Sequence, residues 1–248
     1  MIGVFDSGLG GTMAARELEV LLPEEDICFF ADRLGAPYGT KDEGTLLSLV
    51  MRDIRLLEDE GADRILMACC TASTVHHLLP PEYRSRCVPI IEPTARRALS
   101  LTRCGRIGVI ATERTVGSGA FERALRGMRG ELEVTSVAAQ PLVALIEGGE
   151  RDGNVSVGTV AYIRALLSPL LEARVDTLIL GCTHFPHLAR TVASLAEGVA
   201  LVSSAREGAL EMKKRAPTAP SRGIRKYITE RKGHIKWQNT DAAESTMP

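Results

Sequence analysis

The chain has 248 residues, a hydrophobic content of 45% and a formal net charge of −1. This length suits one large or two medium domains, and this apolar content is sufficient for substantial cores. The balanced charge argues against nucleic acid or an anionic membrane as a partner, and an aromatic content of 4% weakens the case for a base-stacking surface. No apolar run approaches membrane-spanning length, and Met1 leads directly into a predicted strand rather than a signal peptide.

Strands and helices alternate along the chain, with strands predicted from short apolar runs and helices from apolar residues at helical spacing. In the first half we predict strand 2–6, helix 12–22, strand 26–30, helix 41–60, a strand ending before Cys69, and strand 88–91, which Glu92 and Pro93 end. In the second half we predict helix 94–102, strand 106–111, a turn at 112–115, a helix to 128, strand 132–137, helices 141–149 and 155–172, a strand ending before Cys182, helix 186–196 and strand 199–203. This alternation predicts an α/β fold with parallel sheets covered on both faces.

One motif occurs twice. Residues 62–71 and 175–184 each contain an Asp, an apolar run, a small residue, and a Cys with Thr close behind. A second pair, 2–7 and 107–112, repeats in the same order and at a similar separation. Each Cys would lie at the carboxyl end of a buried parallel strand, where open α/β sheets bind ligands. We therefore predict two pseudo-symmetric α/β domains that face each other across a central cleft and share one site.

Two thiols across a cleft suit one chemistry, in which a proton leaves one face of a carbon and another returns to the opposite face. The alternative is that Cys69 and Cys182 are inert, because free Cys is commonly a buried small hydrophobe. None of the six cysteines has Cys-x-x-Cys spacing, and the adjacent Cys69 and Cys70 suit neither a metal nor an ordinary disulfide. We expect reduced thiols, no bound metal and a cytoplasmic protein.

Two loops of the first half are candidates for the same site. A Gly-rich turn at 6–11 follows a strand and precedes a helix, so its backbone N–H groups can bind an anion. It lacks the spacing of a dinucleotide fingerprint, and a carboxylate is the smaller anion that fits; a plain tight turn is the alternative. The loop at 31–39 ends in Pro-Tyr-Gly and can reach the rim near Asp6. We interpret His76 and His77 as surface or packing residues.

Five short motifs occur in order between residues 2 and 204. They are Asp6-Ser7-Gly8-Leu9-Gly10-Gly11, Pro37-Tyr38-Gly39, Cys69-x-Thr71, Ile110-Ala111-Thr112 and Leu180-Gly181-Cys182-Thr183-His184. Together they resemble the cofactor-independent glutamate racemases of bacterial cell-wall synthesis. The resemblance implies interconversion of L- and D-glutamate without pyridoxal phosphate, metal or any other cofactor, which would supply D-glutamate for peptidoglycan.

The resemblance also implies roles for individual residues. Cys69 and Cys182 would be the catalytic acid/bases, Asp6 and His184 their partners, and Glu147 a third polar residue of the site. The implied substrate contacts are Ser7, Pro37, Tyr38, Gly39, Cys70, Thr71, Thr112, Thr115 and Thr183. The chain departs from the family at Cys70, where the family has Asn, because a thiol is a poor hydrogen-bonding group. It also departs from the family at residues 10–14 and 203–204.

The predicted first domain spans 1–92 plus 205–237, the second spans 93–204, and 238–248 is a disordered tail. A basic segment at 221–237 is either a nucleic-acid or partner patch or, as we favour, a terminal segment packed on the first half. We expect glutamate as the small-molecule substrate, a homodimer, and no membrane or nucleic-acid partner. The alternatives are a racemase for aspartate or another small acidic amino acid, or a catalytically weak homologue that acts by binding.

Overall fold

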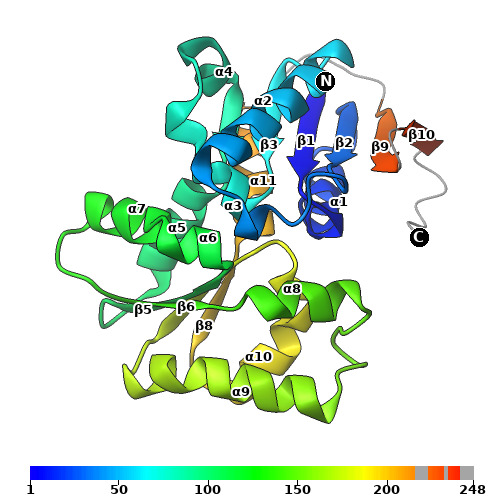
Figure 1. Cartoon of the computed structure of the whole chain (residues 1–248). Coiled ribbons are helices and arrows are strands. Elements are labelled where there is room, and N and C mark those ends of the chain that lie inside the picture. The colour runs from blue at the N-terminus through cyan, green and yellow to red at the C-terminus, as the bar shows by residue number, and fades with distance from the viewer. Residues whose placement is uncertain (216–222, 232–233, 241–248) are drawn as a thin grey trace.

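The computed structural model describes residues 1–215, 223–231 and 234–240, which form two sheets connected by helices (Figure 1). A six-stranded sheet has the order β10-β9-β2-β1-β3-β4, and a four-stranded sheet has the order β6-β5-β7-β8. The strands of the first sheet are β1 Ile2–Asp6, β2 Ile27–Ala31, β3 Arg64–Met67, β4 Cys87–Pro89, β9 Arg225–Arg231 and β10 His234–Thr240. Those of the second are β5 Arg106–Ala111, β6 Glu133–Ala138, β7 Thr177–Gly181 and β8 Ala200–Ser203.

The two sheets share one topology, which is the structural form of the sequence repeat. The order β2-β1-β3-β4 in the first sheet matches β6-β5-β7-β8 in the second, and these strands are parallel in both. In each sheet the strand order reverses at one point, which lies between β1 and β3 in the first sheet and between β5 and β7 in the second. Ligands of open α/β sheets bind at such a switch point. The predicted fold class, two α/β units with parallel sheets, is confirmed.

Helices cover the sheets on both faces. They are α1 Thr12–Leu21, α2 Glu43–Asp59, α3 Cys70–Ser73, α4 Pro81–Arg86, α5 Ile91–Leu101, α6 Glu113–Gly117, α7 Ala120–Met128, α8 Gln140–Glu147, α9 Val157–Glu172, α10 Ala189–Leu195 and α11 Ser204–Arg215. Strand β1 shows how alternation sorts its side chains, because Val4 packs in the core with α1 and α11 while Phe5 packs with α2 on the other face. Asp42 begins α2 by accepting a hydrogen bond from Thr45 N at 2.9 Å.

The second sheet is built in the same way. Ile110 of β5 packs with α8 and α9, whereas Val109 faces α5 and α7 and belongs to the core that also holds α1 and α11. One continuous apolar core therefore connects the two sheets through α5 and α11, which fixes how their strand ends approach each other. Helices α5 and α11 pack between the sheets and contribute to this shared core. The domain limits given above stay a prediction. No helix in the described part of the chain is long and apolar enough to cross a membrane.

The structure corrects four expectations. Strand β10 pairs antiparallel with β9, so the first sheet is mixed, and residues 238–240 belong to β10 rather than to a disordered tail. Residues 241–248 lie outside the described residues. Strand β4 ends at Pro89 and α5 starts at Ile91, because proline is tolerated in a first helical turn and Pro93 lies there. The segment 112–115 is not a plain turn, since Thr112 caps α6. Helix α4 was not predicted.

The basic terminal segment packs on the first half, as we favoured. Strand β9 lies parallel to β2, and Ile228 is fully buried in the core beneath α2. Arg225 is also buried and forms an ion pair with Glu19 of α1 at 3.8 Å. Strand β10 then extends the sheet by one more strand, and a truncation after Trp237 would remove its last three residues.

Candidate active site

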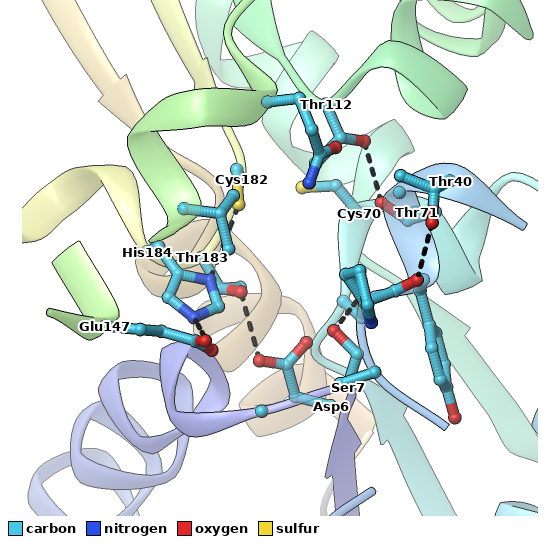
Figure 2. A pocket seen from close by; sticks show the side chains of 18 of the residues that line it. Asp6, Ser7, Thr40, Cys70, Thr71, Thr112, Glu147, Cys182, Thr183 and His184 are labelled. Carbon is cyan, nitrogen blue, oxygen red and sulfur yellow. Dashed lines mark hydrogen bonds and ion pairs between the residues drawn. The ribbon is translucent and has the colours of Figure 1, made fainter. Parts of the chain in front are cut away.

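A pocket of about 560 Å³ lies where the carboxyl ends of β1, β3, β5 and β7 converge (Figure 2). That volume is within the range of small-molecule sites. Of the fourteen residues predicted for the site, thirteen line it: Asp6, Ser7, Pro37, Tyr38, Gly39, Cys69, Cys70, Thr71, Thr112, Glu147, Cys182, Thr183 and His184. Thr115 does not line it. Three further lining residues, Gly8, Arg33 and Ala36, belong to the two candidate loops. The residues missed by sequence reasoning are Thr40, Glu113, Gln140, Pro141, Val143 and Ala144.

Cys182, His184 and Glu147 form a hydrogen-bonded chain on one side of the pocket (Figure 2). The Cys182 Sγ lies 3.6 Å from Nδ1 of His184, and Nε2 of the same ring lies 3.1 Å from Oε1 of Glu147. Burial lowers the pKa of His184, but the hydrogen bonds with Cys182 and Glu147 outweigh it and raise that pKa well above its usual range. The hydrogen bond from His184 lowers the pKa of Glu147. The geometry therefore supports an imidazolium held between a thiol and a carboxylate.

Cys69 lies beside a different acid. Asp6, at the end of β1, is fully buried, and its Oδ2 accepts hydrogen bonds from Gly11 N at 2.5 Å and Thr183 Oγ1 at 3.3 Å. Its Oδ1 is buried without a hydrogen-bond partner among the described residues, and the carboxyl interacts with the Cys69 thiol. Burial raises the pKa of Asp6 and also raises that of Cys69, which the nearby Asp6 raises further. Both groups accordingly tend to hold their protons, unlike the ion pair at His184.

Gly10 allows the Gly-rich turn after β1 to lie directly against the residues that follow β7. A Cβ at Gly10 would lie 2.5 Å from Nδ1 of His184 and 2.7 Å from Oγ1 of Thr183. No side chain fits there without moving the histidine that contacts Cys182. The Gly-rich turn thus serves close approach of two strand ends.

Three threonine hydroxyls form a cluster on another wall. Thr71 Oγ1 lies 2.9 Å from Thr112 Oγ1 and 3.2 Å from Thr115 Oγ1, and the latter two oxygens lie 2.8 Å apart. Thr71 follows β3 and the other two begin α6, so the cluster joins the two halves of the molecule. Thr115 is 1% exposed and lies behind the lining residues, where it can act on a ligand only through Thr71 and Thr112.

Tyr38 is placed differently from its neighbours Pro37 and Gly39. Its hydroxyl makes hydrogen bonds to two buried carboxylates, 2.7 Å from Asp32 Oδ2 and 2.5 Å from Asp53 Oδ2. Arg52 bridges the same two acids, with Nη2 2.6 Å from Asp32 Oδ2 and 2.8 Å from Asp53 Oδ1. This buried network holds the 33–40 loop against α2, and any contact of Tyr38 with a ligand comes from atoms other than its hydroxyl.

The site holds no recognisable metal position. Within residues 1–215, 223–231 and 234–240, no three His, Cys, Asp or Glu side chains are grouped so that they could bind a metal ion. The reactive side chains that line the pocket are thiols, an imidazole, carboxyls and hydroxyls.

Comparison with known proteins agrees with this geometry. The Asp/Glu/hydantoin racemase family matches residues 29–212. A glutamate racemase of Desulforudis audaxviator is 43% identical over 188 residues, covering 75% of this chain and 68% of the relative. The crystal structure of glutamate racemase isoform RacE1 from Bacillus anthracis aligns with a TM-score of 0.82 at 32% identity, covering 92% of this chain and 87% of that one. A Francisella tularensis glutamate racemase in complex with D-glutamate aligns with a TM-score of 0.81 at 25% identity and the same coverage. The chain therefore belongs to the Asp/Glu/hydantoin racemase family, among its glutamate racemases.

Proposed function

We propose that this chain interconverts L- and D-glutamate by proton transfers between the α-carbon of the substrate and two cysteine thiols. The observation that carries the proposal is the pair Cys69 and Cys182, which follow equivalent strands, β3 and β7, and line one pocket. Each thiol has its own proton-handling neighbour, Asp6 for the first and His184 for the second. The similarity to glutamate racemases supports the same function.

The step follows from the chemistry of the α-carbon. One sulfur, as thiolate, removes the α-proton, so a C–H bond breaks, an S–H bond forms, and the electron pair spreads into the α-carboxylate. The second sulfur, as thiol, gives its proton to the opposite face of the carbon. The roles of the two sulfurs then reverse for the other enantiomer.

The two thiols have different surroundings. Nδ1 of His184 lies 3.6 Å from the Cys182 Sγ, so the ring can exchange a proton with this sulfur during the reaction. Burial and Asp6 favour the protonated form of Cys69. The two thiols therefore have different partners: an imidazole for Cys182, and for Cys69 a buried carboxyl whose Oδ1 has no hydrogen-bond partner among the described residues.

The substrate would be an acidic amino acid. Its carboxylates need hydrogen-bond donors, such as backbone N–H groups of the Gly-rich turn, and its ammonium needs acceptors such as Ser7 Oγ and the carboxyl of Asp6. The relative from Francisella tularensis holds D-glutamate, which supports glutamate over aspartate or another small acid. The D-glutamate formed would serve peptidoglycan synthesis. A homodimer stays a prediction.

The test is racemisation in heavy water without added cofactor. Purified chain is incubated separately with L-glutamate, D-glutamate and L-aspartate, and optical rotation and mass are followed early in the reaction. We expect the product enantiomer of glutamate to carry one deuterium at Cα while recovered substrate stays largely unlabelled. Product that retains the substrate proton would refute the two-thiol mechanism, and racemisation of aspartate alone would support the alternative substrate. Binding of glutamate without turnover would favour the weak-homologue alternative.

Two variants identify the thiols. Cys69→Ser and Cys182→Ser each replace a thiol by a hydroxyl that is far harder to ionise, so racemisation should fall by orders of magnitude in both directions. Each variant should still bind D-glutamate in a calorimetric titration, because neither sulfur is the main ligand of the charged groups. Cys104→Ser is the matched control, since that thiol is exposed and lies outside the pocket. Near-normal turnover in either pocket variant would contradict the assignment.

A further inference from the structure

Helix α8 forms one wall of the pocket and carries a residue that neither the repeat nor the motifs indicated. Gln140, Val143, Ala144 and Glu147 share one helix face, and all four line the pocket. Seven residues of helix rise span about 10 Å, so Gln140 lies far along the wall from Glu147 and its partner His184. The two polar ends of this wall are separated by apolar side chains.

The Gln140 amide lies beside the threonine cluster. A Cβ on Gly39 would collide with its Oε1 and would lie 3.0 Å from Cβ of Thr112. The Oε1 atom is buried and has no hydrogen-bond partner among the described residues. The amide nitrogen also makes no hydrogen bond among the described residues. The amide therefore packs its oxygen against Gly39 and leaves two N–H hydrogens uncommitted.

The threonines next to it cannot supply such hydrogens freely. Thr71, Thr112 and Thr115 have three hydroxyl hydrogens, and the three contacts between their oxygens can use all of them. A carboxylate bound at this wall would take a hydroxyl hydrogen only by breaking a contact within the cluster. The amide nitrogen of Gln140 can donate without such a rearrangement. Gln140 is also the one side-chain amide among the residues that line the pocket.

We propose that Gln140 is a specificity-determining residue that donates a hydrogen bond from Nε2 to a carboxylate of the amino-acid substrate, at the wall formed by Thr71, Thr112 and Gly39. This proposal rests on the proposed function, and it identifies a carboxylate as the substrate group that is bound at this end of the pocket. Cys70, on the same side of the pocket as Thr71, supplies only a weak hydrogen-bonding group. Gln140 thus provides a side-chain amide to the pocket from the opposite half of the molecule.

The test compares three substitutions of one residue. Q140M keeps the length without polar hydrogen bonding, Q140E keeps the shape but replaces the donor by a negative charge, and Q140N keeps the amide on a shorter stem. The dissociation constant of D-glutamate is measured by calorimetry, and kcat and KM are measured in both directions. We expect a loss of affinity of about 10- to 100-fold for Q140M, the usual consequence of losing a hydrogen bond to a charged group. Q140E should lose more than Q140M, and Q140N less.

The matched control is R164M, which places the same new side chain on an exposed position of α9 outside the pocket. L-glutamine identifies which carboxylate is bound. If it is the α-carboxylate, Q140M weakens glutamine and glutamate alike, and kcat also falls because the carbanion charge spreads onto that group. If it is the side-chain carboxylate, the loss for glutamate appears in KM and glutamine binds the variant as it binds the parent.

Two results would overturn the proposal. One is a Q140M chain whose affinity, KM and kcat all stay within twofold of the parent. The other is a Q140E chain that binds D-glutamate as well as Q140M does, which would mean that residue 140 only fills space between α8 and Gly39. A parent chain that binds glutamate without racemising it would refute the proposed function, while calorimetry on the same variants would still decide the role of Gln140.

Discussion

Replacing Glu147 by Gln tests whether the charge of the His184 imidazolium sets the activity of Cys182. The substituted amide can still accept a hydrogen bond from Nε2 of His184, so the ring keeps its position while its counter-charge is lost. At 3.1 Å, the two charges interact by about 5 kcal/mol at an effective dielectric constant near 20. The Glu147 side chain is 45% exposed, and solvent screening reduces the interaction to about 1–2 kcal/mol.

That energy corresponds to about one pKa unit at His184. Because the carboxylate raises the pKa of His184, its removal lets the ring lose its proton at lower pH. We expect the basic limb of the kcat/KM profile to move down by about one pH unit, so that kcat/KM on that limb falls about tenfold while kcat/KM at neutral pH changes much less. L- and D-glutamate have equal free energies, so kcat/KM must fall by the same factor in both directions, which is an internal check.

The assay is circular dichroism of glutamate racemisation from pH 6 to pH 10, with E133Q as control because Glu133 is exposed and lies outside the pocket. An unchanged basic limb together with a rate within twofold of the parent would show that Glu147 does not act through His184. A large loss of affinity for D-glutamate at constant kcat would instead identify Glu147 as a substrate contact.

Three further outcomes follow from other parts of the structure. Cys70→Asn should keep or raise racemase activity, because burial holds the pKa of this thiol above its usual range and an amide is the better hydrogen-bonding group; complete loss would show that Cys70 carries chemistry. Burial and the neighbouring Asp32 raise the pKa of Asp53 to about 7, above its value in the unfolded chain. The melting temperature of the protein should therefore decline as pH rises from about 4 to 7. Asp53→Asn should flatten that decline when the melting temperature is measured by calorimetry at several pH values. Asp176→Ala should lower the melting temperature by about 4–8 °C, equivalent to about 2 kcal/mol, because its carboxylate holds the loop 102–104 through three hydrogen bonds of 2.6–2.8 Å. Those bonds lower the pKa of Asp176, so this contribution is present above about pH 4 and disappears as pH falls; an equal melting temperature in the variant at pH 7 would refute it.

Local pattern was enough to place the reactive residues at strand ends. Short apolar runs before Cys69 and Cys182 predicted β3 and β7, and the repeat predicted that both strands occupy equivalent positions, which the shared strand order confirms. That inference succeeds because a buried parallel strand has a distinctive composition and ends at the ligand-binding edge of its sheet. The Asp of each repeat was visible too, but its role was not: Asp63 binds the amino terminus and Asp176 ties down a loop.

Sequence patterns were weakest where an element depends on distant partners. Strands β9 and β10 lie in a basic, polar segment without strand periodicity, and they form because β2 offers an unpaired edge. The sequence predicts that α5 starts after Pro93, whereas the helix begins at Ile91, because a first helical turn tolerates proline.

By itself the sequence determined the α/β alternation, the duplicated halves and the two cysteines at equivalent strand ends, and its resemblance to a known family supplied most of the thirteen predicted residues that line the pocket. Only the tertiary structure decided which side chains touch: His184 and Glu147, the Tyr38 hydroxyl and two buried acids, and Gln140 beside Thr112 and Gly39. His184 and Glu147 are 37 positions apart and Tyr38 and Asp53 are 15 apart, so these contacts follow from how separate elements of the fold pack. Short-range periodicity carries no information about that packing, because it records which face of an element is buried but not what lies against it.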